Sequence, residues 1–324
     1  MDHSHIRVIS IGSATQDVFL MGKNLAAKRD VRTHSYVEQF PLGAKLDIEA
    51  VHYDTGGGAA NAAVTFARQG LTSSYSGKIG RDPAGAEIMR VLKKEGIITS
   101  HVKIDHKHGT GYSTILLAPN GERTILSYRG ASSYLRPEDF YNQVLDADWF
   151  YISSLSGNLE LLKRLLLHAS KYNIKVALNP GGGELANAAK LRKLLSQVHI
   201  LMANRQEMQL LFGGETPVET MVNAMPECHY VVMTDGPRGS YATVGNIIYY
   251  TGQYKKVKVV DRLGAGDAFC SGFVAAIAKG MPIEDAMSLG SANSTSVVEQ
   301  IGAKAGILRE GHKVKRMKVK RASI

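Results

Sequence analysis

The sequence predicts an α/β fold in which helices flank a mainly parallel sheet and a small second sheet accompanies it. Short apolar strands and helical stretches alternate through most of the 324 residues, and this alternation is typical of parallel sheets. Two regions of extended sequence, residues 18–55 and 111–128, interrupt the alternation. The sequence contains no internal repeat and no low-complexity linker, so we expect a single domain.

The first third of the chain predicts one strand and two helices. Residues 7–11 are an apolar run closed by a glycine, which predicts a buried strand. Residues 59–68 predict a helix of small residues, and residues 83–94 predict an amphipathic one. Pro83 stands in the first turn of that second helix, where proline is favoured because its missing N–H would have no intrahelical partner.

The second half of the chain continues the alternation. The predicted strands lie at residues 149–152, 175–178, 199–202 and 230–233, and the predicted helices at 159–172, 184–195 and 205–212. A further β-rich stretch at 257–260 runs into a Gly-Ala-Gly turn, and an apolar helix follows at once. This order predicts parallel strands joined by helical crossovers.

The two extended regions predict the second sheet. Residues 111–128 read as a hairpin that turns at Pro119-Asn120-Gly121, and residues 18–55 lack a helical period. Extended segments inserted between α/β units would lie over the main sheet. A lid over a binding site is the functional interpretation, and an ordinary edge sheet is the alternative.

Composition restricts the class of protein. No apolar run reaches the ~18 residues needed to span a bilayer, and the segment from Met1 to His5 lacks the layout of a signal peptide. Only two cysteines occur, Cys228 and Cys270, which favours reduced thiols over a disulfide scaffold. We therefore expect a cytoplasmic protein with no membrane partner.

The net charge of +10 is concentrated near the C-terminus, where six basic residues lie between positions 313 and 321. No aromatic residue is interleaved among them, so the stacking platform of a nucleic-acid site is missing. We expect residues 1–308 to form the domain and residues 309–324 a solvated basic tail, with an anionic partner as the alternative. The remaining positive charge suits an enzyme that handles phosphates.

The segment Gly264-Ala265-Gly266-Asp267 is the strongest candidate for chemistry. Small residues at a helix start leave the backbone N–H groups and the positive end of the helix dipole open to an anion. Asp267 in the first turn would accept a proton from an attacking hydroxyl, or would only complement the dipole. The same dipole stabilises a carboxylate, so Asp267 is expected to be a weak base whose position does most of the work.

This segment, following Asp261, resembles the C-terminal signature of the ribokinase (PfkB-type) family of carbohydrate and nucleoside kinases. The likeness extends over about residues 6–308. It implies a ribokinase-like fold with a β-sheet lid, ATP as phosphoryl donor, Mg²⁺ as cofactor, and a hydroxyl of a sugar or nucleoside as acceptor. It also implies that Asp267 is the catalytic base and that Gly264, Ala265 and Gly266 form the anion hole.

Other matches concern the acceptor. The run from Gly12 to Asp17 resembles the family's opening motif, whose aspartate holds substrate hydroxyls; taken alone, Asp17 would be a turn residue. Gly57 and Asn61 match the diglycine hinge and the substrate-binding asparagine, although a glycine cluster at a helix start is the plain alternative. Arg129 follows the hairpin and would reach an acidic or phosphate group of a substrate, or lie on a solvated face.

Further matches concern the nucleotide. Asn204 and Glu207 match the family's Asn-x-x-Glu motif, linked to Mg²⁺ through water and to phosphate placement; as an isolated pair they predict a helix cap with its capping box. The remaining nucleotide-binding candidates are Thr234, Gly236 and Gly239 in a glycine-rich turn, and Asn293 on the late helix that the resemblance places at the adenine pocket.

The resemblance also implies a monovalent cation, with K⁺ as the candidate, bound by the backbone at Asp261, Leu263 and Gly302. Family members usually carry a small polar residue after the aspartate, where this chain has Arg262-Leu263. Relatives commonly dimerise through the lid edge, so a homodimer is the oligomer that the resemblance allows. Which sugar, sugar phosphate, sugar acid or nucleoside is the acceptor does not follow from these motifs.

Two other functions were weighed against a kinase. Gly181-Gly182-Gly183 satisfies a loose dinucleotide-binding pattern and would indicate a dehydrogenase, although Pro180 intervenes between strand and glycines. A member that binds a sugar or nucleoside without catalysis would not need an intact Asp267. The sequence has no P-loop motif, and His106 and His108 have no third ligand at metal spacing, so we interpret them as surface residues.

Overall fold

The structure is a computed structural model that describes residues 3–25, 27–31, 34, 36–118, 123–140 and 145–323. The predicted turn at Pro119-Asn120-Gly121 and residues Met1 and Asp2 lie outside the described residues. No helix within the described ranges combines the length and hydropathy that crossing a bilayer requires.

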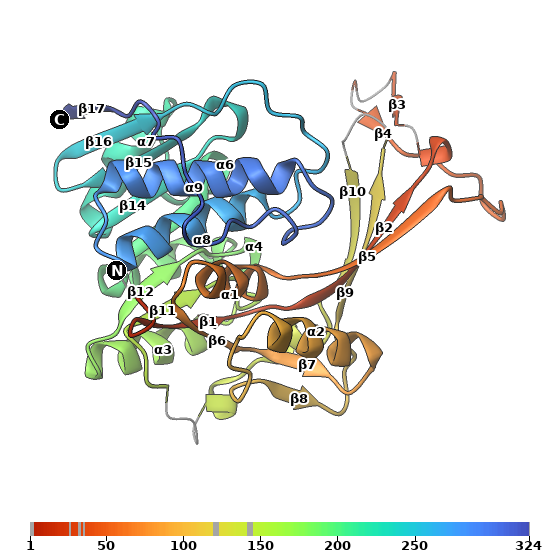
Figure 1. Ribbon diagram of the computed structural model, residues 1–324, viewed down its shortest axis with the longest axis horizontal. Helices are drawn as coiled ribbons and strands as arrows, with labels where there is room; N and C mark the ends of the chain where they lie inside the picture. The colour runs from red at the N-terminus through yellow and green to blue at the C-terminus, as the bar shows by residue number, and fades with distance from the viewer. Residues whose placement is uncertain are drawn as a thin grey trace.

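The main sheet has nine strands among the described residues (Figure 1). Its first six strands in spatial order, β6 to β14, are parallel, and the last three are antiparallel. The spatial order is β6 (Thr72–Ser76), β1 (Arg7–Ile11), β11 (Trp149–Ile152), β12 (Lys175–Leu178), β13 (Ile200–Asn204), β14 (Tyr230–Thr234), β15 (Ser240–Val244), β16 (Ile247–Thr251) and β17 (Lys320–Ser323).

Helices cover both faces of this sheet because neighbouring strand residues point to opposite sides. Val8 packs with one group of helices and Ile9 with the other. The group on the side of Val8 is α1 (Gly58–Arg68), α8 (Ala265–Ala278) and α9 (Ile283–Val298). The group on the side of Ile9 is α3 (Leu159–Lys171), α4 (Gly182–Leu185), α5 (Ala188–Arg192), α6 (Arg205–Phe212) and α7 (Pro217–Ala224).

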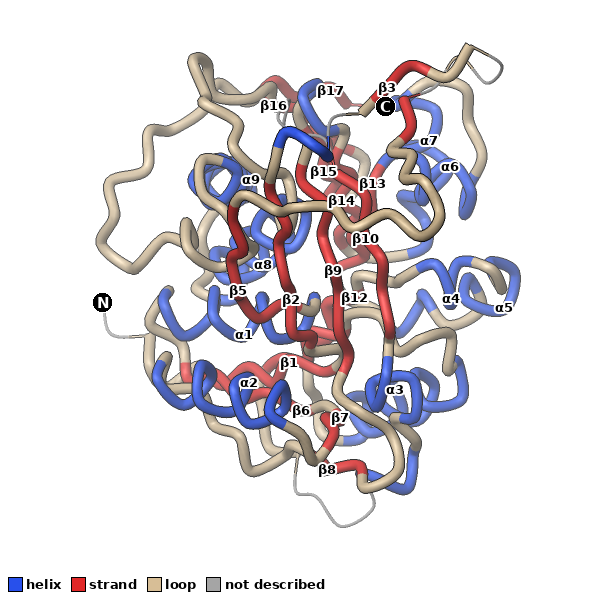
Figure 2. The backbone as a smooth tube through the Cα atoms, turned by 90° about the vertical axis from the view of Figure 1, so that its right-hand side faces the viewer, coloured by secondary structure: helices blue, strands red, loops and turns tan. Residues whose placement is uncertain are grey.

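A second sheet of four strands, in the order β10-β9-β2-β5, presents its broad face in Figure 2. We call it the lid sheet; its strands are β2 (Thr15–Met21), β5 (Ala50–Gly56), β9 (Gly111–Leu117) and β10 (Arg123–Tyr128). β2 begins a few residues after β1 ends, and α1 begins directly after β5. The lid sheet is therefore tied at two points to the carboxyl ends of the main strands, where α/β proteins bind ligands.

Two small strand pairs and one more α-helix complete the strands and α-helices of the described residues. The pairs are β3 (Lys28–Arg29) with β4 (Tyr36–Val37), and β7 (Lys78–Gly80) with β8 (Lys103–Asp105), and the helix is α2 (Pro83–Lys94). The helix bounds predicted at 83–94 and 205–212 are confirmed by α2 and α6.

Two predicted elements were wrong. The stretch at 257–260 is not a strand: the N–H groups of Val260 and Asp261 donate to the carbonyl of Val298 at the end of α9, at 2.8 and 3.3 Å. A β-rich composition was overridden there by contact with a helix end. The helix predicted at 184–195 is divided into α4 and α5, because Asn187 leaves the helical conformation between them.

The segment predicted as a solvated tail is packed on the domain. Residues 320–323 form β17, which extends the main sheet next to β16, and Val314 and Val319 pack against the core on the α8–α9 side. Arg316 pairs with Asp285 at 2.8 Å. All six basic side chains between 313 and 321 nevertheless remain exposed. The alternation of apolar and basic residues was thus the pattern of an edge segment rather than of a free tail.

Asp82 joins helix α2 to the start of the lid sheet. It caps α2 by accepting from the N–H of Gly85 at 2.8 Å, and it accepts from the N–H and hydroxyl of Thr110 at 2.7 and 2.6 Å. Desolvation raises the pKa of Asp82, but these hydrogen bonds outweigh it and hold the pKa below its ordinary value. The carboxylate therefore stabilises the folded state while it is ionised.

Asp82→Ala should lower the free energy of unfolding at pH 7 by about 1–2 kcal/mol, as for a lost helix cap. Since the folded pKa is depressed, this contribution is present above the unfolded pKa and is lost as the pH falls through the folded pKa. Urea denaturation at several pH values checks both points. Glu87→Ala, on the exposed face of α2 beside Arg90, is the control and should change little; equal losses for the two variants would contradict the prediction.

Candidate active site

Helix α8 begins where the main sheet, the lid sheet and the loop after α9 converge. Its N-cap, Gly264, has φ 75°, and a Cβ there would collide with Ala303 in that loop. Glycine is therefore required for both conformation and space. In the first turn of α8 the N–H of Ala265 donates to the carbonyl of Arg262 at a long 3.4 Å, and Ala265 and Gly266 contribute only small side chains. The anion-hole role of this turn stays a prediction.

Asp267 lies in the first turn of α8, and its carboxylate accepts a hydrogen bond from α1. The Nδ2 of Asn61 donates to Oδ2 of Asp267 at 2.9 Å. Burial raises the pKa of Asp267, and the bond from Asn61 and the charge of Lys304 oppose that shift only in part. Burial therefore shifts the pKa of Asp267 in the direction opposite to the one expected from the helix dipole. The strength of Asp267 as a base stays a prediction.

The acceptor side is built by β2 and the start of α1. Asp17 is buried on β2, and its Oδ1 accepts from the hydroxyl of Thr15 at 2.8 Å. Burial raises the pKa of Asp17, while Lys304 and the hydroxyls of Thr15 and Ser113 lower it in part. Gly57 has φ 94°, and a Cβ there would lie 2.5 Å from the backbone of Ala14, so the hinge also requires glycine.

Two charged residues of this site were missed by the sequence analysis. Lys304 is 5% exposed, and its Nζ lies 3.3 Å from Oδ1 of Asn61 and 3.6 Å from Oδ1 of Asp54. Asp54 stands directly opposite Asp17 in the pairing of β5 with β2. The sequence does contain a signal for Lys304: it is a single lysine within a run of alanines and glycines at 302–306. Its side chain is therefore the only long one in that run.

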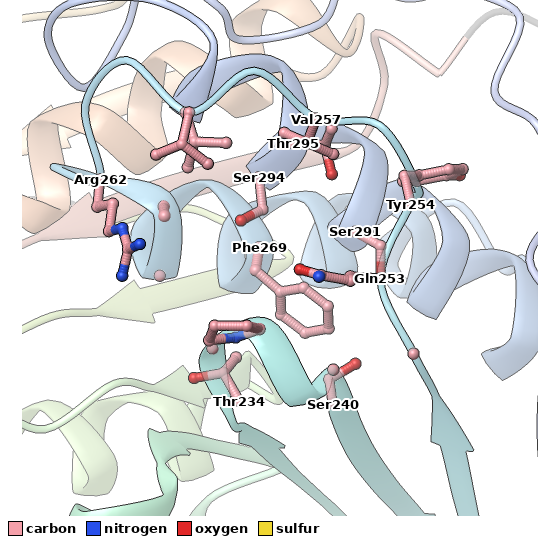
Figure 3. A pocket seen from close by; sticks show the side chains of 18 of the residues that line it. Thr234, Ser240, Gln253, Tyr254, Val257, Arg262, Phe269, Ser291, Ser294 and Thr295 are labelled. Atoms are coloured by element: carbon pink, nitrogen blue, oxygen red, sulfur yellow. The ribbon is translucent and has the colours of Figure 1, made fainter. Parts of the chain in front are cut away.

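A cavity of about 850 Å³ opens beside the first turn of α8 (Figure 3). Phe269 lies in its middle, with Thr234 and Ser240 on one side and Ser291 and Ser294 on the other. Five of the predicted phosphate and nucleotide residues line it: Thr234, Gly236, Gly239, Ala265 and Gly266. Its size, and a lining that joins an apolar side to a helix start, suit a nucleotide.

Asn293 does not line this cavity, which corrects its predicted place at the adenine pocket. Its side chain is fully buried: Nδ2 donates to the carbonyl of Ala268 and Oδ1 accepts from the N–H of Leu308, at 2.8 and 2.9 Å. Ser294 and Thr295, the next residues along α9, face the cavity instead. Neighbouring residues on a helix point in directions about 100° apart. The motif match did not show which residue of α9 faces the cavity.

Asn204 and Glu207 form the capping box that the plain interpretation predicted. The side chain of each accepts a hydrogen bond from the backbone N–H of the other, at 3.0 and 2.9 Å. Burial raises the pKa of Glu207, and the charge of Asp267 contributes to the same shift. The pair therefore caps α6, and Glu207 also interacts electrostatically with Asp267, so the structural interpretation does not exclude the functional one.

Asp261 ties together the two loops assigned to the monovalent cation. Its fully buried carboxylate accepts from the N–H of Leu263 at 2.9 Å and of Gly302 at 3.1 Å. The backbone at these positions is thereby held in place without any contribution from the side chain of Leu263. The departure at Arg262-Leu263 leaves this carboxylate clamp intact, and Arg262 itself lines the large cavity.

The remaining candidates are Arg129 and the histidines. Arg129 is exposed at the end of β10, and its backbone carbonyl lies beside Gly111, as do Ala14 and Thr15 of the acceptor side. Its contact with a substrate stays a prediction. His108 stacks on Tyr134, with ring centroids 3.6 Å apart, and pairs with Asp105, a local contact rather than a metal site. Nowhere in the described ranges do three or more His, Cys, Asp or Glu side chains gather as metal ligands would.

In the dinucleotide-like glycine segment, a carboxylate of the protein already accepts the backbone hydrogen bond that a phosphate would need. Glu184 is buried and accepts from the N–H groups of Gly181, Leu155 and Gly157 at 2.8, 2.9 and 2.6 Å. The helix that follows, α4, has four residues. A pyrophosphate would compete with this carboxylate for the N–H of Gly181, so the dehydrogenase interpretation loses its only support.

Comparisons with known proteins agree on one family. The model described as pfkB family carbohydrate kinase matches residues 9–309. A ribokinase of Staphylococcus aureus (strain COL) is 27% identical over 314 residues, 93% of this chain and 96% of the relative. A 5-dehydro-2-deoxygluconokinase of Bacillus subtilis (strain 168) is 29% identical over 290 residues, 79% of this chain and 88% of the relative.

Solved structures show the same fold. The structure of Arabidopsis thaliana ribokinase complexed with ribose and ATP superposes with a TM-score of 0.76 and 21% sequence identity, covering 94% of this chain and 96% of that chain. The predicted α/β architecture, a large mainly parallel sheet flanked by helices with a small second sheet, is confirmed.

Proposed function

The chain belongs to the pfkB family of carbohydrate kinases, and we propose that it transfers the γ-phosphoryl group of ATP to a hydroxyl group of a sugar. The observation that carries this proposal is the position of Asp267. Its carboxylate lies in the first turn of α8, whose Ala265 and Gly266 line the large cavity, and it is bonded to Asn61 of α1, which follows the lid sheet. The cavity proposed for ATP and the residues proposed for the sugar are thus both next to one carboxylate.

The proposed reaction is an in-line displacement at phosphorus. The acceptor oxygen forms a bond to the γ-phosphorus, the bond from that phosphorus to the β–γ bridging oxygen breaks, and ADP leaves. The hydroxyl proton passes to Asp267. Oδ2 of Asp267 already accepts one hydrogen bond from Asn61, so Oδ1 is the oxygen with both lone pairs left for that proton. The raised pKa of Asp267 makes it a better acceptor than an ordinary aspartate.

The residues around Asp267 would orient the two substrates. Asp17, buried and held by Thr15 and Ser113, would bind hydroxyls of the sugar. The N–H groups at Ala265 and Gly266 would bind the charge that develops on the phosphoryl oxygens. The lid sheet would exclude water, which would otherwise compete with the sugar for the phosphoryl group.

Cations would complete the nucleotide side. Mg²⁺ suits the described residues as an ion held mainly by phosphates and water, since they hold no cage of protein ligands, and Glu207 would contact its hydration shell. When bound, Mg²⁺ supplies charge neutralisation for the phosphates. A monovalent cation such as K⁺ would be held by backbone carbonyls of the loops that Asp261 clamps. Free Cys228 and Cys270 fit the reducing cytoplasm, where we propose the enzyme works.

The function is tested by ADP release over a panel of acceptors, each with and without K⁺. The panel contains pentoses, hexoses, sugar phosphates, sugar acids and nucleosides. We expect acceptor-dependent ADP release for at least one sugar, and a faster rate with K⁺. Turnover of nucleosides alone would make the chain a nucleoside kinase. Tight binding of a sugar or nucleoside without ADP release would reject catalysis in favour of a ligand-binding member.

A further inference from the structure

We propose that Lys304 is a positioning residue for phosphoryl transfer, because its buried ammonium group fixes the amide of Asn61 in the orientation that lets it hold Asp267. The consequence for catalysis rests on the proposed function. The placement of the three side chains does not: Lys304, Asn61 and Asp267 form one continuous chain of contacts from the loop after α9 to the start of α8.

Lys304 is held rigidly in place. Its side chain is nearly fully buried, and its backbone carbonyl accepts from Nη1 of Arg68 at 2.8 Å. On the N-terminal side, Ala303 packs against Gly264, and the N–H of Gly302 donates to Asp261. A long cationic side chain anchored in this way has few alternative positions, so the location of its ammonium group is determined by the fold.

The orientation of Asn61 follows from the chemistry of its two neighbours. An ammonium group only donates hydrogen bonds and an ionised carboxylate only accepts them. Asn61 lies between the two, so its Oδ1 must face Lys304 and its Nδ2 must face Asp267, as the distances of 3.3 and 2.9 Å indicate. A flipped Asn61 amide would point Nδ2 at the Lys304 ammonium group, and two donors facing each other are unfavourable. Without the ammonium group this penalty disappears, so the amide could turn Oδ1 toward the Asp267 carboxylate.

Lys304 also offsets a concentration of negative charge. The pairing of β2 with β5 places Asp17 directly opposite Asp54, an unfavourable cross-strand pair of like charges. The ammonium group lies 3.6 Å from Oδ1 of Asp54 and lowers the pKa of both Asp17 and Asp267 against the effect of burial. A single cation therefore opposes the effect of burial on both Asp17 and the proposed base.

Three other titratable groups that interact with Asp267 are neutral or negative, whereas Lys304 carries a positive charge. Among the groups that interact electrostatically with Asp267 are Lys304, Glu207, Cys270 and Tyr151. Burial raises the pKa of Glu207, of the Cys270 thiol and of the Tyr151 hydroxyl. Lys304 is the one cation of this set, so its removal should change the titration of Asp267 in a direction that no other member would compensate.

The first experiment measures that titration directly and needs no substrate. Protein labelled with ¹³C at aspartate carboxylates is titrated by NMR, and the Asp267 signal is assigned by its loss in Asp267→Asn. In Lys304→Met the midpoint of Asp267 should rise by about one pH unit or more, the effect of losing a nearby opposite charge. In Lys304→Arg, which keeps a donor-only cation, the midpoint should stay close to that of the wild type.

The second experiment measures turnover across pH. Lys304→Met should lower kcat by roughly 10- to 100-fold, as for a misplaced catalytic group, and should shift the acid limb of kcat/KM to higher pH because the base protonates earlier. Asp54→Asn is the comparison variant for the titration: it breaks the same ion pair but leaves the ammonium group on Asn61, so the Asp267 midpoint should stay close to that of the wild type.

The outcomes separate the proposal from its alternatives. Equal losses in Lys304→Met and Asp54→Asn, with an unchanged Asp267 midpoint, would mean that Lys304 is only an ion-pair partner of Asp54 and would overturn the proposal. If Lys304→Met does not fold, the titrations of the other two variants decide. A shifted Asp267 midpoint in Lys304→Arg, or a raised Asp267 midpoint in Asp54→Asn, would contradict the proposal. If the wild type phosphorylates no acceptor, the proposed function fails while the NMR titration still tests the positioning.

Discussion

Asp267→Asn is expected to lower kcat by about 10²-fold or more, the usual contribution of a general base, while ATP and the sugar still bind. The introduced amide has nearly the same shape, and its oxygen can still accept the hydrogen bond from Asn61 that now reaches Oδ2 at 2.9 Å. What is lost is the group that takes the hydroxyl proton. Steady-state kinetics and isothermal titration with a non-hydrolysable ATP analogue measure the two properties separately.

The control for this substitution is Asp285→Asn. Asp285 also lies in the first turn of a helix, α9, and pairs with Arg316 at the surface. If Asp267 merely complemented a helix dipole, the two substitutions would have similar small effects on stability and none on turnover. Near-normal turnover in Asp267→Asn would exclude it as the base.

Gly264→Ala is expected to destabilise the protein strongly and to abolish most of its activity. Gly264 has φ 75°, which costs a residue with a Cβ about 1–2 kcal/mol, and the added methyl group would collide with Ala303. Relief of that collision would move the start of α8 away from the loop that carries Lys304. The free energy of unfolding in urea should fall by about 2 kcal/mol or more, by the strain and overpacking together.

Gly266→Ala separates stability from function at the same helix start. Gly266 lies within α8, and a Cβ there would meet no neighbouring atom. The fold should therefore be as stable as the wild type or gain up to about 1 kcal/mol from the better helix former. Because Gly266 lines the cavity, the methyl group would occupy space proposed for the phosphoryl group, and kcat should fall. Unchanged kcat in Gly266→Ala would contradict the anion-hole role.

Local pattern was a reliable guide to the regular elements. The apolar runs at 7–11, 149–152 and 175–178 are the strands β1, β11 and β12, because a buried parallel strand needs apolar residues on both faces. The predictions at 257–260 and 184–195 failed because tertiary contacts, rather than local sequence, determine the secondary structure there. Whether a β-rich stretch becomes a strand depends on whether an open sheet edge is beside it.

The candidate site was predicted in part. Asp17, Asn61, Asp267 and Glu207 are brought toward one centre by four different elements, and the resemblance to the ribokinase family identified all four. The direction of their hydrogen bonds was not predictable: Asn61 was expected to bind substrate hydroxyls, and it also holds Asp267. Asn293 was assigned to the wrong side of α9 because a motif match does not specify a helical face.

The sequence by itself determined the fold class through its periodicity and an anion-binding helix start through residue types at short spacing, and its resemblance to the motifs of a known family identified the kinase. Only the tertiary structure decided the electrostatics of that base. The raised pKa of Asp267 comes from burial, and its opposition by Lys304 comes from a residue in a distant loop. Desolvation and charge proximity depend on which segments the fold brings together, and no local pattern encodes them.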